Sequence, residues 1–286
     1  MGGPDWAYGV GPQDERESVA AIHRAVGQGI NWIDTAAVYG LGHSEEVVSR
    51  ALAGLPPSGR PLIFTKCGLV WKEKRIRRRL GAKSIRREAE ASLRRLGVET
   101  IDLYQIHWPN ASTIVEAWRT LVELRTEGKV RHIGVSNFDV SQLERLRAIA
   151  PVESLQPPYS FARRGIENEI LPYCEEQGIG VIVYSPLESG LLSGKMTRER
   201  IEALPDSDWR KRKGEEFREP KLSRNLALAD RVRAAAARMS VSPAALAVAW
   251  TLKHHAVTGA VVGARSATQI DDLVKAAEID VGEDLT

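Results

Sequence analysis

The sequence predicts one α/β domain, a parallel (β/α)8 barrel that is one strand short. Short apolar runs alternate with amphipathic helical stretches along all 286 residues, and no change of composition divides the chain. Runs that are apolar on both faces and separated by helices are typical of parallel strands joined by right-handed crossovers. Since a barrel of this kind takes about 250 residues, we expect a single domain over residues 1–286.

Seven apolar runs are candidate strands, one fewer than a closed barrel of eight needs. In chain order they are 31–34, 61–66, 101–107, 132–136, 154–156, 181–185 and 259–263. An open doubly wound sheet is the competing architecture, and it would carry G-x-G-x-x-G after its first strand. Gly9-Val10-Gly11 lacks the third glycine and follows no strand. The barrel is therefore favoured.

Several helices carry recognisable start signals. Ser242-Pro243 has the pattern of an N-cap followed by proline at the first helical position. Capping-box spacing occurs three times, from Thr113 to Glu116, from Ser141 to Glu144 and from Ser266 to Gln269. The stretch 193–223 is long, polar and poorly periodic, so it is predicted to be a loop insertion of the kind that closes over a ligand.

Composition excludes several classes of protein. The chain has 40 Lys+Arg against 37 Asp+Glu, a net charge of +3, so no nucleic-acid partner is predicted. Two cysteines and the lack of C-x-x-C or H-E-x-x-H spacing predict neither a disulfide framework nor a metal site. No window approaches the ~18 apolar residues of a membrane span, and no targeting segment begins the chain. We expect a cytoplasmic protein without a membrane partner, and composition does not indicate its oligomeric state.

Polar residues stand where five of the predicted strands end, at the face of a barrel that carries the chemistry. They are Asp34, Lys66, His107, Asn137 and Gln156. Lys66 and Asp34 end neighbouring strands, where an ion pair would satisfy both, and a purely structural pair would look the same.

Tyr39 lies five residues beyond Asp34, close enough for its phenol to fold back over the barrel mouth. A tyrosine with the ordinary pKa near 10 donates its proton poorly at neutral pH. We expect the ammonium of Lys66 to lower that pKa, and His107 to hydrogen-bond the substrate oxygen. The predicted site polarises a carbonyl group and delivers a proton to it.

These residues fall within segments that closely resemble the aldo-keto reductase superfamily. The segments are D34-T-A-A-V-Y-G-L-G-H-S-E45, F64-T-K66, D102-L-Y-Q-I-H107-W-P, I133-G-V-S-N-F138, Y184-S-P-L187 and G263-A-R265 with Gln269. The resemblance runs from about Ala20 to the C-terminus, and it is greatest to a bacterial subgroup with a long loop after the seventh strand. It implies a (β/α)8 barrel that reduces aldehydes and ketones reversibly with NADPH and without metal.

The resemblance also implies a role for each residue. Tyr39 would be the general acid, Lys66 and Asp34 its activating pair, and His107 the group that orients the carbonyl. The residues implied to bind NADP(H) are Ser136, Asn137, Gln156, Tyr184, Ser185, Leu187, Gly190, Leu192, Gly263, Arg265 and Gln269. The loop 193–223 would cover the cofactor.

Two further observations concern the ligands. A helix beginning after Arg265 would suit the 2′-phosphate of NADPH, although Arg265 also fits a solvated surface position. Trp6, Trp71 and Trp108 are candidates to line an apolar substrate pocket.

The sequence also departs from the family pattern. Compared with the family, the chain is expected to begin after the first strand and to end before the last helical segment is complete. Leu273 stands where many relatives carry an asparagine that faces the adenine, so that contact is not expected here.

Three other features bear on function. The basic run 72–79 lacks interleaved aromatic residues and contains Glu73, so it is interpreted as a solvated loop bordering the active-site mouth. A barrel lysine can also form an imine, which makes a Schiff-base lyase using Lys66 one alternative to the reductase. A cofactor-binding redox sensor or regulatory subunit is the other alternative.

Overall fold

The computed structural model describes residues 13–282. Its main sheet has seven strands in the order β1-β2-β5-β6-β7-β8-β9, and all neighbouring pairs are parallel. The strands are β1 (Trp32–Asp34), β2 (Leu62–Cys67), β5 (Ile101–Ile106), β6 (Val130–Ser136), β7 (Ser154–Gln156), β8 (Gly180–Tyr184) and β9 (Val257–Val261). All seven predicted strands are confirmed, with β9 beginning two residues earlier than expected.

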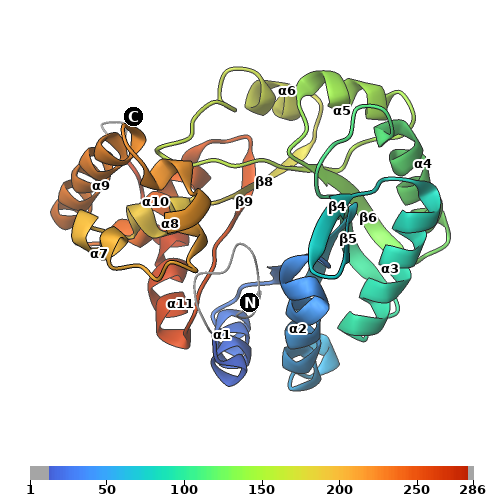
Figure 1. Cartoon of the computed structure of the whole chain (residues 1–286), viewed down its shortest axis with the longest axis horizontal. Coiled ribbons are helices and arrows are strands. Elements are labelled where there is room, and N and C mark those ends of the chain that lie inside the picture. The colour runs from blue at the N-terminus through green and yellow to red at the C-terminus, as the bar shows by residue number, and fades with distance from the viewer. Residues whose placement is uncertain (1–12, 283–286) are drawn as a thin grey trace.

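Helices surround these strands and form the outer layer of a barrel (Figure 1). The longer ones are α1 (Glu15–Gly27), α2 (His43–Ala53), α3 (Ala82–Leu96), α4 (Ile114–Thr126), α5 (Val140–Arg147), α9 (Lys221–Arg238) and α10 (Pro243–Lys253). Shorter helices are α6 (Ile170–Glu176) and α11 (Ala267–Leu273). Helix α4 buries an apolar face against the strands, with Trp118 fully buried and its indole N–H donating to the carbonyl oxygen of Ala150 at 3.2 Å, whereas α9 packs on α10. The (β/α)8-type fold is confirmed.

The strands of the described residues do not close the barrel between β1 and β9. Within residues 13–282, β1 and β9 pair with no strand on their outer edges, as the count of seven predicts. A cavity of about 320 Å³ lies between them and is bordered by α1, α10 and α11. The ring of Trp32 reaches across, 3.2 Å from the position that a Cβ would take on Gly259.

One of the predicted helix starts is confirmed and one is wrong. The Ser242 hydroxyl accepts the N–H of Ala245 at 3.0 Å, and Pro243 is the first residue of α10. Helix α5 begins at Val140 rather than after Ser141, because Asp139 caps it in a capping box with Gln142. The Asp139 carboxylate, two residues before Ser141, accepts the N–H of Gln142 at 2.8 Å and so starts the helix before Ser141 is reached.

The other two capping boxes do not form, although helices begin at those positions. Thr113 precedes α4 but its side chain caps nothing, and the Glu116 carboxylate instead accepts the N–H of Ala82 at 3.0 Å. The Gln269 side chain accepts the N–H of Arg265 at 2.7 Å and not that of Ser266. In both cases the side chain that a capping box would use accepts a different backbone N–H instead.

The basic run 72–79 forms most of a hairpin and not a loop. Strand β3 (Leu69–Lys72) pairs antiparallel with β4 (Arg75–Arg78). Glu73 and Lys74 make the two-residue turn, both with positive φ, as hairpin turns of this length require. The prediction that the run is solvated is confirmed, since its charged side chains are exposed.

The segment 193–223 contains short helices where a loop was expected. They are α7 (Arg198–Glu202) and α8 (Trp209–Lys213), and α9 begins within it at Lys221. A small apolar cluster holds the segment to the loop after β8; its members are Leu191, Met196, Ile201, Phe217 and Leu222. Helices of five residues are too short to show a clear periodicity in the sequence.

Among the described residues, no helix is both long enough and apolar enough to cross a membrane.

Candidate active site

A buried ion pair joins the ends of β1 and β2. The Lys66 ammonium donates to the Asp34 carboxylate at 2.5 Å and to the carbonyl oxygen of Thr35 at 2.9 Å. The two charged side chains are 0% and 5% exposed. The amide of Gln156 on β7 donates to the other oxygen of Asp34 at 2.8 Å. Asp34 therefore links opposite sides of the barrel, and the predicted pairing with Lys66 is present.

Tyr39 begins a tight 3₁₀ turn, Tyr39–Gly42, in which Gly40, Leu41 and Gly42 all have positive φ. The turn places its ring edge-to-face with His107, with centroids 5.6 Å apart, and 5.5 Å from the Lys66 ammonium. The structure thus brings together the four side chains that the sequence singles out for catalysis.

The pKa of Tyr39 moves in the direction opposite to the one expected. Burial of the phenol raises its pKa, and the negative charge of Asp34 raises it further. The expectation that Lys66 lowers this pKa is wrong, because the carboxylate of Asp34 offsets the nearby ammonium and the phenol is removed from water. Tyr39 therefore holds its proton firmly at neutral pH.

His107 is neutral in this setting. Burial and the charge of Lys66 lower its pKa well below the usual range. Its Nδ1 has no hydrogen-bond partner among the described residues, and its carbonyl oxygen accepts the Asn137 amide at 3.0 Å. A neutral imidazole carries one N–H donor that can meet an uncharged oxygen.

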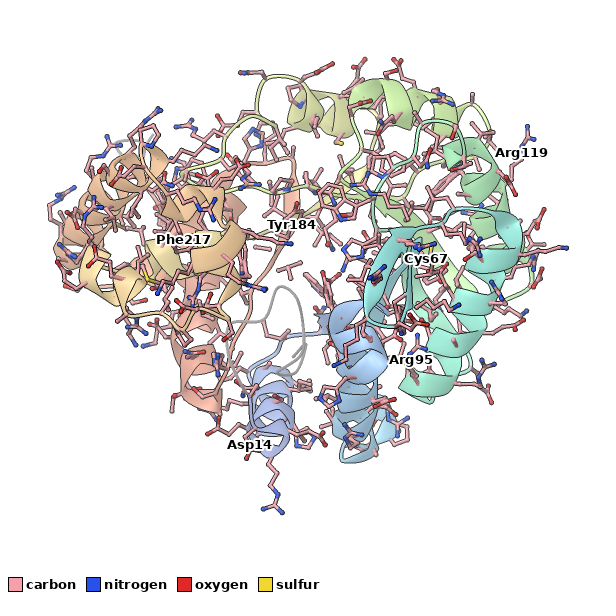
Figure 2. The ribbon with its side chains drawn as sticks, viewed as in Figure 1. Asp14, Cys67, Arg95, Arg119, Tyr184 and Phe217 are labelled. Carbon is pink, nitrogen blue, oxygen red and sulfur yellow. The ribbon has the colours of Figure 1, made fainter. Side chains whose placement is uncertain are left out.

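Amide and hydroxyl groups gather beside this cluster, at the ends of β6, β7 and β8. The Asn137 amide nitrogen contacts the Ser136 hydroxyl at 2.9 Å, and its oxygen accepts the Tyr184 hydroxyl at 2.7 Å. Asn137 has φ of 66°, a left-handed conformation that occurs preferentially at functional sites. Together with Gln156 these side chains form a wall of planar amides and one aromatic ring. Figure 2 shows Tyr184 near the middle of the molecule.

The loop after β8 has the backbone shape of an anion site. Ser185, Glu188, Ser189 and Gly190 all have positive φ. Backbone N–H groups in such turns point into a shared concavity that attracts anions. Leu187 and Leu192 belong to the same loop, where the Leu192 N–H donates to the Leu187 carbonyl at 3.1 Å.

The segment 193–223 contacts this loop through a buried pair that the sequence analysis missed. Arg210 donates to the Asp208 carboxylate at 2.7 Å and to the carbonyl oxygen of Ser189 at 3.3 Å. Burial raises the pKa of Asp208, but hydrogen bonds from Arg210 and the charge of Arg265 outweigh it and hold the pKa below its usual range. The signal in the sequence was Asp208, an acidic N-cap residue before a short helix, but the stretch around it was interpreted as a loop.

The residues present suit a nicotinamide dinucleotide. The amide wall matches a carboxamide, the Tyr184 ring matches a flat heterocycle, and the anion-shaped loop matches a diphosphate. At the far end Arg265 supplies a cation, and a Cβ added to the adjoining Gly263 would meet nothing within 4 Å. Residues 13–282 hold no group of three or more potential ligands that could bind a metal ion.

The candidate substrate tryptophans lie in three different settings. Trp6 lies outside the described residues. Trp71, on β3, has its ring 5.9 Å from the guanidinium of Arg95. Trp108 directly follows His107, is 36% exposed, and lies beneath the guanidinium of Arg78 at 5.3 Å.

Sequence comparison connects this geometry with known proteins. The pattern of the Aldo/keto reductase family matches residues 1–284. The chain is 37% identical over 275 residues to aldo-keto reductase YhdN of Bacillus subtilis (strain 168), covering 96% of this chain and 81% of that protein. It is 34% identical over 304 residues to the NADH-specific methylglyoxal reductase of Escherichia coli (strain K12), covering 99% and 91%.

Two solved structures are similar to this chain in both fold and sequence. A glycerol dehydrogenase from Gluconobacter oxydans matches all of this chain and 86% of its own, with a TM-score of 0.88 and 41% identity. An aldo/keto reductase from Klebsiella pneumoniae, in complex with NADP and acetate, matches 94% and 82%, with a TM-score of 0.71 and 26% identity. With its barrel, its buried Tyr39–Lys66–Asp34–His107 cluster and a family match along almost its whole length, this chain belongs to the aldo/keto reductase family.

Proposed function

We propose that this oxidoreductase reduces aldehydes and ketones to alcohols with NADPH, with Tyr39 as the general acid. The observation that carries the proposal is the convergence of Tyr39 and His107 on the buried ion pair of Lys66 and Asp34, beside the amide wall. A carbonyl oxygen placed between Tyr39 and His107 would meet a phenol that holds its proton and a neutral imidazole N–H.

Each residue of the cluster has a separate task. The cofactor, when bound, supplies the hydride. His107 donates a hydrogen bond that orients the carbonyl, and Tyr39 gives its proton to the oxygen as negative charge develops there. The Lys66 ammonium then stabilises the phenolate that remains, and Asp34 keeps Lys66 charged and in place.

The proposed cofactor contacts follow the order of the strands. Ser136, Asn137 and Gln156 bind the carboxamide and Tyr184 stacks on the ring. The residues proposed for the diphosphate are Ser185, Leu187, Gly190 and Leu192, and those for the 2′-phosphate end are Gly263, Arg265 and Gln269. The segment 193–223 covers the cofactor, and Trp71 and Trp108 border the substrate.

The Schiff-base alternative is disfavoured by the state of Lys66. Imine formation needs an amine that is free to attack the carbonyl carbon, whereas the Lys66 nitrogen already donates to Asp34 at 2.5 Å and to the carbonyl oxygen of Thr35 at 2.9 Å. A regulatory subunit could share the same residues, and turnover distinguishes it from a reductase.

Methylglyoxal and glycerol, named for two relatives, provide an assay in both directions. We expect the absorbance of NADPH to fall when the protein is given NADPH with methylglyoxal or another aldehyde of a panel. We expect NADPH absorbance to rise when the protein is given NADP⁺ with glycerol. A chain that binds NADPH tightly but turns over no member of the panel would contradict the reductase and support the regulatory role.

Charge reversal at Arg265 tests the choice of cofactor. We expect Arg265→Glu to weaken NADPH binding roughly 10- to 100-fold, the loss of one or more hydrogen bonds to a charged group, and to leave NADH binding nearly unchanged. Dissociation constants can be read from quenching of tryptophan fluorescence. Arg119→Glu, on the exposed face of α4 far from the covering segment (Figure 2), is the matched control. Equal affinity for both cofactors before and after the change would show that Arg265 does not select NADPH.

A further inference from the structure

The hairpin β3–β4 concentrates positive charge directly after the strand that carries Lys66. We call residues 69–79 the basic hairpin. It holds six cationic side chains and a single acid, Glu73, a surplus of five in a chain whose net charge is +3. The cations are Lys72, Lys74, Arg75, Arg77, Arg78 and Arg79. This part of the molecule is thus far more cationic than the rest.

Apart from Lys74, the cations of the hairpin are not neutralised by acidic side chains of the described residues. Lys72, Arg75, Arg77, Arg78 and Arg79 are exposed, and none forms an ion pair in the part of the chain that the structure describes. Lys72 and Arg75 even face each other across the strand pair, an arrangement of like charges that destabilises a hairpin. A partner that contributes negative charge would relieve this repulsion.

The base of the hairpin is held firmly in place. Gly68 has φ of 90°, and a Cβ added there would stand 2.3 Å from a methyl group of Leu80, so the two ends of the hairpin pack without a gap. The Gly68 carbonyl accepts the Arg79 N–H at 2.9 Å, and the Gly68 N–H donates to the buried carboxylate of Glu88 at 2.8 Å. The cations therefore stand at a fixed position relative to β2.

One cation of the hairpin contacts the residue that follows His107. Arg78 pairs with Leu69, so it lies on the same face of the hairpin as Leu69 and Trp71, whereas Arg75 and Arg77 lie on the other face. Its guanidinium lies 5.3 Å above the ring of Trp108, the residue after His107. Arg78 thus lies over the residue that adjoins His107 in the chain, and its guanidinium forms no hydrogen bond or ion pair with the described residues.

We propose that the basic hairpin selects carbonyl substrates that also carry an anionic group, a carboxylate or a phosphate, and that Arg78 binds this group. The proposal rests on the reductase function given above. The planar fork of an arginine matches both anions, and the surrounding cations raise the local concentration of such substrates. Trp108 supports the guanidinium from below and offers an apolar surface to the carbon skeleton.

Matched substrate pairs test the proposal. 4-Carboxybenzaldehyde is compared with methyl 4-formylbenzoate, and 4-formylphenyl phosphate with 4-formylphenyl dimethyl phosphate, each pair differing in charge more than in shape. We expect kcat/KM to favour the anionic member of at least one pair roughly tenfold, mainly through KM, and this preference to shrink as salt is raised. The pair with the larger ratio tells whether the site suits a carboxylate or a phosphate.

Variants then assign the preference to a residue. Arg78→Gln should lower kcat/KM for the anionic substrates much more than for the neutral ones, so that most of the preference is lost, and Arg78→Lys should restore part of it. Arg119→Gln is the matched control on α4. Because Arg78 is exposed, folding is not at risk, and thermal melts verify this.

Two outcomes overturn the proposal. One is neutral substrates turned over as well as anionic ones. The other is an anionic preference that Arg78→Gln leaves intact. If no aldehyde is turned over at all, the reductase function fails, and the hairpin is still tested by fluorescence titration with benzene-1,4-dicarboxylate, which must bind the wild type more tightly than Arg78→Gln.

Discussion

Tyr39→Phe is expected to lower kcat for carbonyl reduction about 10²- to 10⁴-fold, the usual loss when a general acid is removed. NADPH binding should remain nearly intact, because the substitution keeps the ring that packs edge-to-face on His107 and removes only the hydroxyl. Turnover of a nitrobenzaldehyde gives kcat, and quenching of tryptophan fluorescence gives the dissociation constant. Wild-type turnover by the variant would show that another group supplies the proton.

The pH dependence of the reaction rates is a second test of the role of Tyr39. Since burial and Asp34 raise the pKa of Tyr39, the phenol keeps its proton through neutral and moderately alkaline pH. Reduction should therefore show no fall between about pH 7 and 10, the ordinary pKa of tyrosine, and the oxidation of alcohols, which needs an unprotonated acceptor, should rise with pH. A fall in reduction centred well below pH 10 would contradict the raised pKa.

Lys66→Met is expected to destabilise the protein by about 3–5 kcal/mol, the cost of leaving a buried charge without its partner. Among the residues that the structure describes, Asp34 would keep the amide of Gln156 as its one side-chain donor, in a place where its own side chain is 5% exposed. Urea unfolding followed by far-UV circular dichroism measures the loss. Lys129→Met is the control, because Lys129 pairs with Glu90 and Glu127 at the surface and such pairs are worth about 0–1 kcal/mol.

The double variant Lys66→Met/Asp34→Asn separates the pair from the packing. Removing both charges should recover most of the lost stability, since the unpaired carboxylate is then absent. The double variant should nevertheless stay inactive as a reductase. A cost for Lys66→Met no larger than that for Lys129→Met would show that Asp34 is stable without its partner.

Local patterns in the sequence determined most of the barrel. Strands buried on both faces leave continuous apolar runs, so all seven could be located, including the three residues of β7. Because parallel strands end at one face, the polar residues that follow the runs had to meet there. This is why Tyr39, Lys66, Asp34 and His107 could be placed together before any distance was known.

The tertiary structure alone decided features that depend on competition between distant groups. Asp139 rather than Ser141 caps α5, and the Glu116 carboxylate accepts the N–H of Ala82 instead of one in its own helix. In each case the hydrogen bond forms between the donor and acceptor that the fold brings closest. The buried pair of Asp208 and Arg210 lies in a segment whose helices are too short to leave a periodic pattern.

The pKa of Tyr39 shows the same limit at the active site. The sequence places Lys66 near the phenol and so predicts a lower pKa for Tyr39. In the fold, burial of the phenol and the negative charge of Asp34, which pairs with Lys66, raise that pKa instead. Proximity can be inferred from the order of residues along parallel strands. The balance between desolvation and charge depends on how completely the surrounding side chains exclude water, and only the packed structure determines that.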